Sequence, residues 1–142
     1  MEIIVAEPNA VASWQFPASQ EIRIMPIGDI QFGAQGCDID LLQRKLNWAL
    51  EHDFYFIGMG DMVDVASPSN RRRWKQVAAE LYDSLRDAMD EICDTHLRRI
   101  TKILEPTRGR WLGMVTGHHV WEFQDGTNTD TRLAHSLATK YM

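Results

Sequence analysis

Residues 54–64 constrain the fold of this chain more than any other stretch of its sequence. The segment begins with an apolar run of aromatic residues and isoleucine and passes through Gly58 and Gly60 to Asp61. A continuous apolar run of this length is typical of a strand that is covered on both faces. The glycines allow another backbone to approach closely at the strand end. Because a carboxylate is costly where a core ends, Asp61 is predicted to be paired or to bind a cation.

Two further segments have the same design, an apolar run followed by glycine and a residue type that binds metals. They are residues 24–29, which end in Asp29, and residues 111–119, which end in two histidines. Loops at the carboxyl ends of parallel strands are where open α/β sheets bind ligands. We therefore expect Asp29, Asp61 and His118 to converge on one site.

Helical patterns separate the three predicted strands. Apolar residues recur at helical spacing over residues 39–50, and either Asp38 or Asp40 is suited to cap this helix. A longer helical region is predicted over residues 71–105, and a last helix is predicted to begin near residue 129 or 130. Strands that alternate with helices in this way predict an α/β fold, with a parallel core sheet and crossover helices.

The chain divides into an arm and one domain. Residues 1–20 contain a short apolar run followed by a segment rich in Pro, Asn and Ser, which predicts an N-terminal arm or edge strand. Trp14 and Phe16 are expected to pack on the body of the protein. Residues 21–142 are predicted to form a single α/β domain, since the chain of 142 residues suffices for one domain with a core.

Composition narrows the function classes. The net charge of −5 argues against a protein whose whole surface binds nucleic acid, although it leaves room for a local basic patch. Cys37 and Cys93 are far apart in the sequence and form no C-x-x-C pair, so we interpret them as free thiols and small core residues. No apolar run is long enough for a membrane span, and the acidic N-terminus does not fit a signal peptide. We expect a cytoplasmic protein with no membrane partner.

The residue types at the three strand ends indicate metal chemistry. Carboxylate and imidazole groups from Asp29, Asp61 and His118 suit Mn, Fe, Zn or a similar divalent ion. Asp61, on the middle element, is the natural bridge between two ions, which together can activate water and clamp a phosphate ester. His119 is a candidate general acid for the leaving alkoxide. Asp64 is expected to orient a ligand or accept hydrogen bonds from the loop.

Three short motifs in the chain resemble those of calcineurin-like metallophosphoesterases. They are residues 28–31, 60–64 and 117–119, which are similar to the D-x-H, G-D-x-x-D and G-N-H-[DE] motifs of that family. The likeness is greatest to variants met in phage and prophage genomes and covers residues 21–142. It implies the N-terminal portion of an αββα sandwich and a dinuclear metal site that hydrolyses phosphomonoesters or phosphodiesters.

The resemblance also implies individual roles. Asp29 would bind one metal, Asp61 would bridge two, His118 would stand where an Asn binds the second metal, and His119 would be catalytic. Gln31 occupies the position of a histidine ligand, where its amide oxygen offers a weaker donor. The family has further histidine ligands downstream that this sequence lacks. A C-terminal half or a partner chain would have to supply them.

A cluster of three arginines, Arg71, Arg72 and Arg73, follows the second predicted strand. Arginines near a helix N-terminus bind phosphate well, so these residues are candidates to steer a phosphodiester, including nucleic acid, toward the site. The alternative is a solvated basic loop that balances acidic neighbours.

The sequence therefore supports two alternative functions. The first is a metal-dependent phosphoesterase. The second is a catalytically incompetent domain that acts as a binding module or is completed by a partner, because three or four donors do not fill two coordination spheres.

Overall fold

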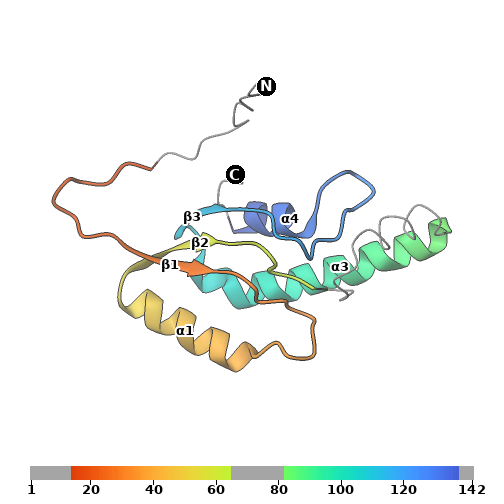
Figure 1. Cartoon of the computed structure of the whole chain (residues 1–142), viewed down its shortest axis with the longest axis horizontal. Coiled ribbons are helices and arrows are strands. Elements are labelled where there is room, and N and C mark those ends of the chain that lie inside the picture. Colours follow the sequence, from red (N-terminus) through yellow and green to blue (C-terminus); the bar gives the residue numbers. More distant parts are fainter. Residues whose placement is uncertain (1–13, 65–81, 138–142) are drawn as a thin grey trace, which may run out of the picture.

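The computed structural model of the chain describes residues 14–64 and 82–137. Three parallel strands form one sheet in the order β1-β2-β3: β1 (Arg23–Ile27), β2 (Phe54–Gly58) and β3 (Trp111–Met114). The helical elements are α1 (Ile39–Glu51), α3 (Asp83–Leu104), the 3-10 helix Glu105–Thr107 and α4 (Thr129–Ser136). The predicted α/β fold with a parallel sheet and intervening helices is thus confirmed (Figure 1). Within these two stretches, no helix has both the length and the apolar character needed to cross a membrane.

The hydrophobic core lies between one face of the sheet and the helices. In Figure 1, α1 and α3 run along the same side of the sheet, while α4 contacts both β3 and α3. Phe56, at the centre of β2, is fully buried and stacks obliquely on Trp111 of β3, with ring centroids 5.3 Å apart. The helices contribute eight buried residues to the same cluster: Leu46, Ala49, Cys93, Leu97, Ile100, Leu104, Leu133 and Ala134.

The other face of the sheet is less covered than the sequence predicts. Tyr55 and Ile57 of β2 are half-buried, and Ile24 of β1 is 44% exposed, so the predicted burial on both faces is wrong for this face. Among the described residues, the arm contributes part of the cover. The indole N–H of Trp14 donates to the Leu112 carbonyl at 2.5 Å, and the Phe16 ring meets Tyr55 edge-on at 5.1 Å. Both aromatic residues thus contact the sheet, as predicted.

The structure decides which acid caps α1 and corrects the predicted start of α3. Asp38, rather than Asp40, caps α1, because its carboxylate accepts the Leu41 N–H at 2.8 Å. Helix α3 begins only at Asp83, since the preceding Tyr82 has extended backbone angles and its carbonyl accepts the first helical hydrogen bond. A helix that continues through Tyr82 is therefore ruled out, and residues 71–81 of the predicted helical region lie outside the described part of the chain.

The two thiols are expected to differ sharply in reactivity. Cys93 is fully buried in α3, where burial and the nearby charges of Asp90 and Asp94 raise the pKa of its thiol to about 12. Cys37 is only half-buried, and burial together with the Asp38 charge also raises the pKa of its thiol. At mildly alkaline pH, a thiol reagent should modify Cys37 in the native protein and Cys93 only after unfolding. Mass spectrometry of labelled peptides checks this, and equal labelling of both thiols in the native protein would contradict it.

Candidate metal centre

The loops that follow the three strands lie against one another at the carboxyl edge of the sheet. After β1, the Asp29 N–H donates to the Gly60 carbonyl at 3.2 Å, and the Gln31 N–H donates to the Asp61 carbonyl at 3.0 Å. The loop after β3 approaches from the other side, so closely that a Cβ atom at Gly117 would overlap the main-chain nitrogen and carboxylate of Asp61. The three strand ends therefore meet, as a parallel sheet predicts.

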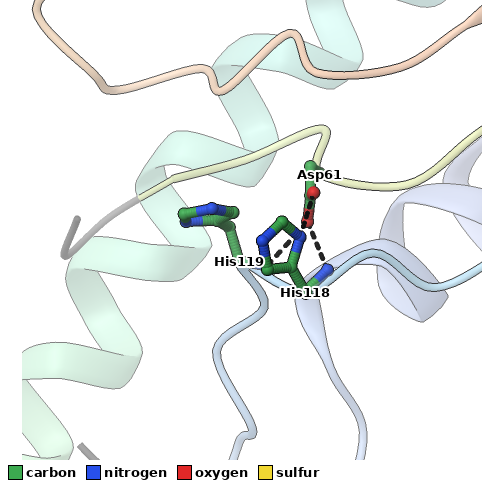
Figure 2. A group of neighbouring side chains, drawn as sticks. All are labelled: Asp61, His118 and His119. Carbon is green, nitrogen blue, oxygen red and sulfur yellow. Dashed lines mark hydrogen bonds and ion pairs between the residues drawn. The ribbon is translucent and has the colours of Figure 1, made fainter. Parts of the chain in front are cut away.

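Asp61 is the centre of the hydrogen bonding at this edge (Figure 2). One carboxylate oxygen, Oδ1, accepts the main-chain N–H groups of both His118 and His119, the latter at 2.6 Å. The other oxygen, Oδ2, lies 2.6 Å from Nδ1 of the His118 ring. The Asp61 side chain is 9% exposed, whereas that of His118 is 66% exposed. A nearly buried carboxylate thus holds an accessible imidazole at the surface of the site.

The environment of Asp61 favours its ionised form. Burial alone would raise the pKa of the carboxyl group, but the N–H groups of His119 and His118 and the His118 ring together lower it below its ordinary value. Asp61 is therefore a carboxylate at neutral pH, as a metal ligand requires.

His119 lies beside His118 but faces a different acid. The two imidazole rings meet edge-on, with centroids 4.4 Å apart. Nδ1 of His119 is 3.5 Å from Oδ2 of Asp64, and both side chains are largely buried, at 16% and 4% exposed. Asp64 follows β2, as Asp61 does, and its carboxylate faces the His119 ring without a hydrogen bond between these two atoms. A carboxylate at one ring nitrogen orients a histidine and leaves its other nitrogen for proton transfer or metal binding.

Three side chains of the site lie close enough together that they could hold a single cation. Asp61, His118 and His119 each offer a ligand atom, and these atoms lie within 4.8 Å of one another. Among the described residues, no other group of three or more acidic, histidine or cysteine side chains meets this condition. One carboxylate and two imidazoles are donors that suit Zn, Mn or Fe. His119, predicted as a general acid, thus also lies within reach of a metal.

Asp29 and Gln31 reach the site with their backbones but are not part of this donor group. Asp29 is exposed, and Gln31 is half-buried. Both have left-handed backbone angles, with φ of +51° and +46°, and so does Asp61 at +54°. Such angles are uncommon for residues other than glycine and concentrate at functional sites. The predicted phosphate-steering arginines, Arg71, Arg72 and Arg73, lie outside the described residues.

Sequence reasoning missed one acidic residue at this edge. Asp130, in the first turn of α4, is fully buried, and its Oδ2 accepts the Gly117 N–H at 2.8 Å. Burial and the nearby charge of Asp61 raise the pKa of its carboxyl group, and the N–H groups of Gly117, Met62 and Asp61 only partly oppose this effect. An acid in the first turn of a helix is ordinarily solvated and interacts favourably with the helix dipole. The sequence therefore carries no signal for the contact between Asp130 and Gly117.

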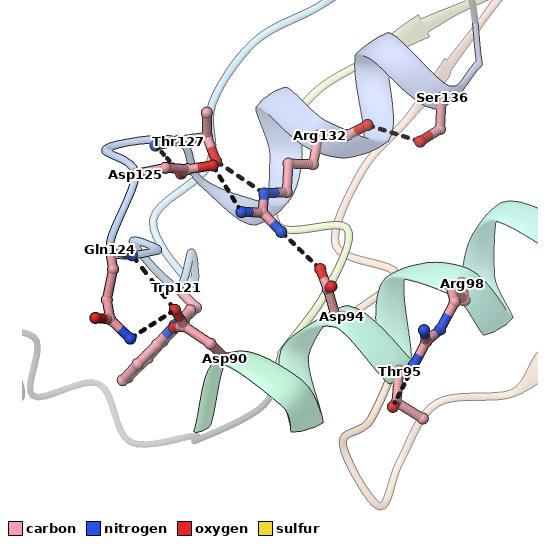
Figure 3. Close-up of polar contacts among 10 residues, drawn as sticks. All are labelled: Asp90, Asp94, Thr95, Arg98, Trp121, Gln124, Asp125, Thr127, Arg132 and Ser136. Carbon is pink, nitrogen blue, oxygen red and sulfur yellow. Dashed lines mark hydrogen bonds and ion pairs between the residues drawn. The ribbon is translucent and has the colours of Figure 1, made fainter. Parts of the chain in front are cut away.

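The segment between the histidines and α4 is anchored on α3 (Figure 3). The Trp121 indole N–H donates to Asp90 at 2.6 Å, and the Arg132 guanidinium donates to Asp94 at 2.6 Å. Arg132 also donates to Asp125 at 2.9 Å and lies over the Phe123 ring. These contacts fix α4 relative to α3 and therefore fix the position of Asp130.

Comparisons with protein-family models, with curated proteins and with solved structures find no match to this chain.

Proposed function

We propose that the chain is a metal-dependent phosphoesterase whose metal centre is built on Asp61, His118 and His119. The observation that carries the proposal is the grouping of their ligand atoms within 4.8 Å at the carboxyl edge of a parallel sheet. The residue motifs at the three strand ends, which resemble those of calcineurin-like metallophosphoesterases, supply the reaction class. The substrate would be a phosphodiester or phosphomonoester, and nucleic acid is one such substrate.

Each residue has a distinct part in this proposal. Asp61 and His118 would hold the metal, whose chemistry is to activate water and to neutralise charge on the phosphate. His119 would donate a proton to the leaving alkoxide, with its ring facing Asp64. In the competing arrangement His119 is a third ligand. The two arrangements differ in whether loss of His119 lowers the rate alone or the metal affinity as well.

A dinuclear centre needs more donors than this group provides. Asp29 and Gln31, on the adjoining loop, are the candidates for a second divalent ion, and the remaining ligands would come from a C-terminal half or a partner chain. The proposed fold of that complete assembly is the αββα sandwich. The half-open sheet face beside Ile24 and Tyr55 is consistent with such an arrangement.

The alternative is a binding module without catalytic activity that a partner completes. The small donor group favours it, because only three ligand atoms come together among residues 14–64 and 82–137. In that case the chain would still bind a divalent cation, although hydrolysis would be absent.

An assay with a chromogenic phosphodiester and Mn²⁺ separates these functions. We expect His119→Ala to lower the hydrolysis rate by about 10²–10⁴-fold, the usual contribution of a general acid. Mn²⁺ affinity, measured by calorimetry in parallel, should change little if His119 only transfers protons and should fall if it is a ligand. Mutation of the exposed His135 in α4 is the control. Equal rates for the wild type, Asp61→Asn and His119→Ala would exclude the enzymatic function.

A further inference from the structure

Three successive main-chain N–H groups after β3 all donate to carboxylates. The Gly117 N–H donates to Asp130, and the next two, from His118 and His119, donate to Asp61. The two acids come from different elements, α4 and the loop after β2. The histidine-bearing segment is thus held between two carboxylates, one of which belongs to the proposed metal site and one of which does not.

We propose that Asp130 is a positioning residue of the metal centre. Its buried carboxylate holds Gly117, and it thereby presents His118 and His119 to Asp61. The effect of Asp130 on metal affinity rests on the proposed function, whereas its effect on the geometry of the histidines does not.

The burial of Asp130 argues for such a role. A fully buried carboxylate costs free energy unless the surrounding groups compensate for its lost hydration. Its Oδ2 accepts the Gly117 N–H from the loop after β3, whereas its Oδ1 is buried without a hydrogen-bond partner among the described residues, so the compensation is incomplete. The N–H groups of Met62 and Asp61, in the loop after β2, also lower the pKa of this carboxyl group. Asp130 is therefore hydrogen-bonded to the loop after β3 and lies close to the loop after β2, the two loops that carry the donor group. A residue that served only α4 would have no need of these partners.

Helix capping does not explain Asp130. The cap of α4 is Asn128, whose side-chain oxygen accepts the Thr131 N–H at 2.8 Å. An exposed acid in the first turn would interact equally well with the helix dipole. The buried orientation of Asp130 thus serves the neighbouring loops. The hydrogen bond from Arg132 to Asp94 attaches α4, which carries Asp130, to α3.

Two substitutions and a matched control test the proposal. Asp130→Ala removes the acceptor, whereas Asp130→Asn keeps a side-chain oxygen that can accept the Gly117 N–H. Asn128→Ala, two residues away, removes the α4 cap without removing a contact to Gly117. The first readout is amide hydrogen exchange of His118 and His119 in the metal-free protein, measured by NMR.

We expect Asp130→Ala to accelerate exchange at His118 and His119 by about tenfold or more. Asp130→Asn should remain close to the wild type, and Asn128→Ala should affect α4 alone. Equal acceleration in Asp130→Ala and Asn128→Ala would overturn the proposal, because the role would then be general stability. If Asp130→Ala does not fold, amide exchange of Gly117 in the wild-type protein tests the proposal instead. A Gly117 amide that exchanges as fast as an exposed one would overturn the proposal, and a protected one would support it.

The second readout is Zn²⁺ affinity, measured by calorimetry. Asp130→Ala should weaken Zn²⁺ binding by about 10–100-fold, as loss of an outer-shell partner does, and Asp130→Asn should restore most of it. Failure of the wild type to bind Zn²⁺ or Mn²⁺ would count against the proposed function, while the exchange data would still judge the positioning role. Undiminished Zn²⁺ affinity in a folded Asp130→Ala would count against Asp130 alone.

Discussion

Replacing Asp61 with asparagine is expected to weaken Mn²⁺ binding by more than about 100-fold, beyond the usual effect of losing an outer-shell partner. Any metal-dependent hydrolysis should be lost with it. The reason is that Asp61 supplies the one carboxylate of the donor group, and its negative charge compensates the positive charge of the ion. Calorimetric titration with Mn²⁺ and the phosphodiesterase assay both measure the effect.

Asparagine is the informative replacement because it preserves the hydrogen bonding. Its carbonyl oxygen can accept the N–H groups of His118 and His119, as Oδ1 of Asp61 does. Its amide can donate to Nδ1 of His118 when the ring proton is on Nε2. Asparagine also tolerates the left-handed backbone at this position, where φ is +54°. The substitution therefore removes charge with little change in shape.

Asp53→Asn is the matched control for this variant. Asp53 also has a left-handed backbone, with φ of +57°, but it precedes β2 and lies at the opposite end of the strand from Asp61. It pairs with Arg110 in an exposed ion pair at 3.3 Å, which contributes little to stability. Asp53→Asn should bind Mn²⁺ like the wild type. Equal loss of affinity in both variants would trace the effect to net charge rather than to the site.

The effect of Asp61→Asn on the free energy of unfolding is expected to depend on pH. Because the folded protein lowers the pKa of Asp61, the ionised group stabilises the fold at neutral pH. This stabilisation is lost as pH falls through the pKa of Asp61 in the folded state. The difference in unfolding free energy between the wild type and Asp61→Asn, both without metal, should therefore shrink as the pH is lowered. Urea unfolding at several pH values measures it.

The sheet was predictable because local and long-range signals agree along these segments. Apolar runs that end in glycine predict β2 and β3 at nearly their observed bounds, and helical periodicity predicts α1. The parallel order follows from the intervening helices, and it places Asp61 and His118 at one edge. The topology alone therefore predicts that these two residues meet.

Other features depend on packing that no local pattern records. Tyr82 interrupts a helical stripe because its backbone is extended, although the apolar periodicity continues across it. Asp130 looks like a solvated first-turn acid, and only the approach of α4 to the loop after β3 buries it. Asp29 follows the right kind of strand, yet its side chain stands outside the donor group. The sequence predicts which edge of the sheet carries the site and that Asp61 and His118 lie there. It does not predict which other side chains join the donor group.

Replacing Gly117 with alanine is expected to disrupt the site as completely as loss of Asp61. A Cβ atom at Gly117 would overlap both the main-chain nitrogen and the carboxylate of Asp61, and neither is the free end of a flexible side chain. Either the loop after β3 or the loop after β2 must move, which separates the histidines from Asp61. Overpacking of this kind should lower the free energy of unfolding by about 3 kcal/mol and abolish measurable Mn²⁺ binding.

Gly36→Ala provides the control for this prediction, because a Cβ atom at Gly36 would meet nothing within 4 Å. It should leave both stability and Mn²⁺ affinity unchanged. Urea unfolding gives the stability of each variant, and calorimetry gives its affinity for Mn²⁺. If Gly117→Ala were as stable as Gly36→Ala and bound Mn²⁺ equally well, the close contact between the loops after β2 and β3 would not exist in solution. The grouping of Asp61 with His118 and His119 would then lose its structural basis, because that contact is what brings the two loops together.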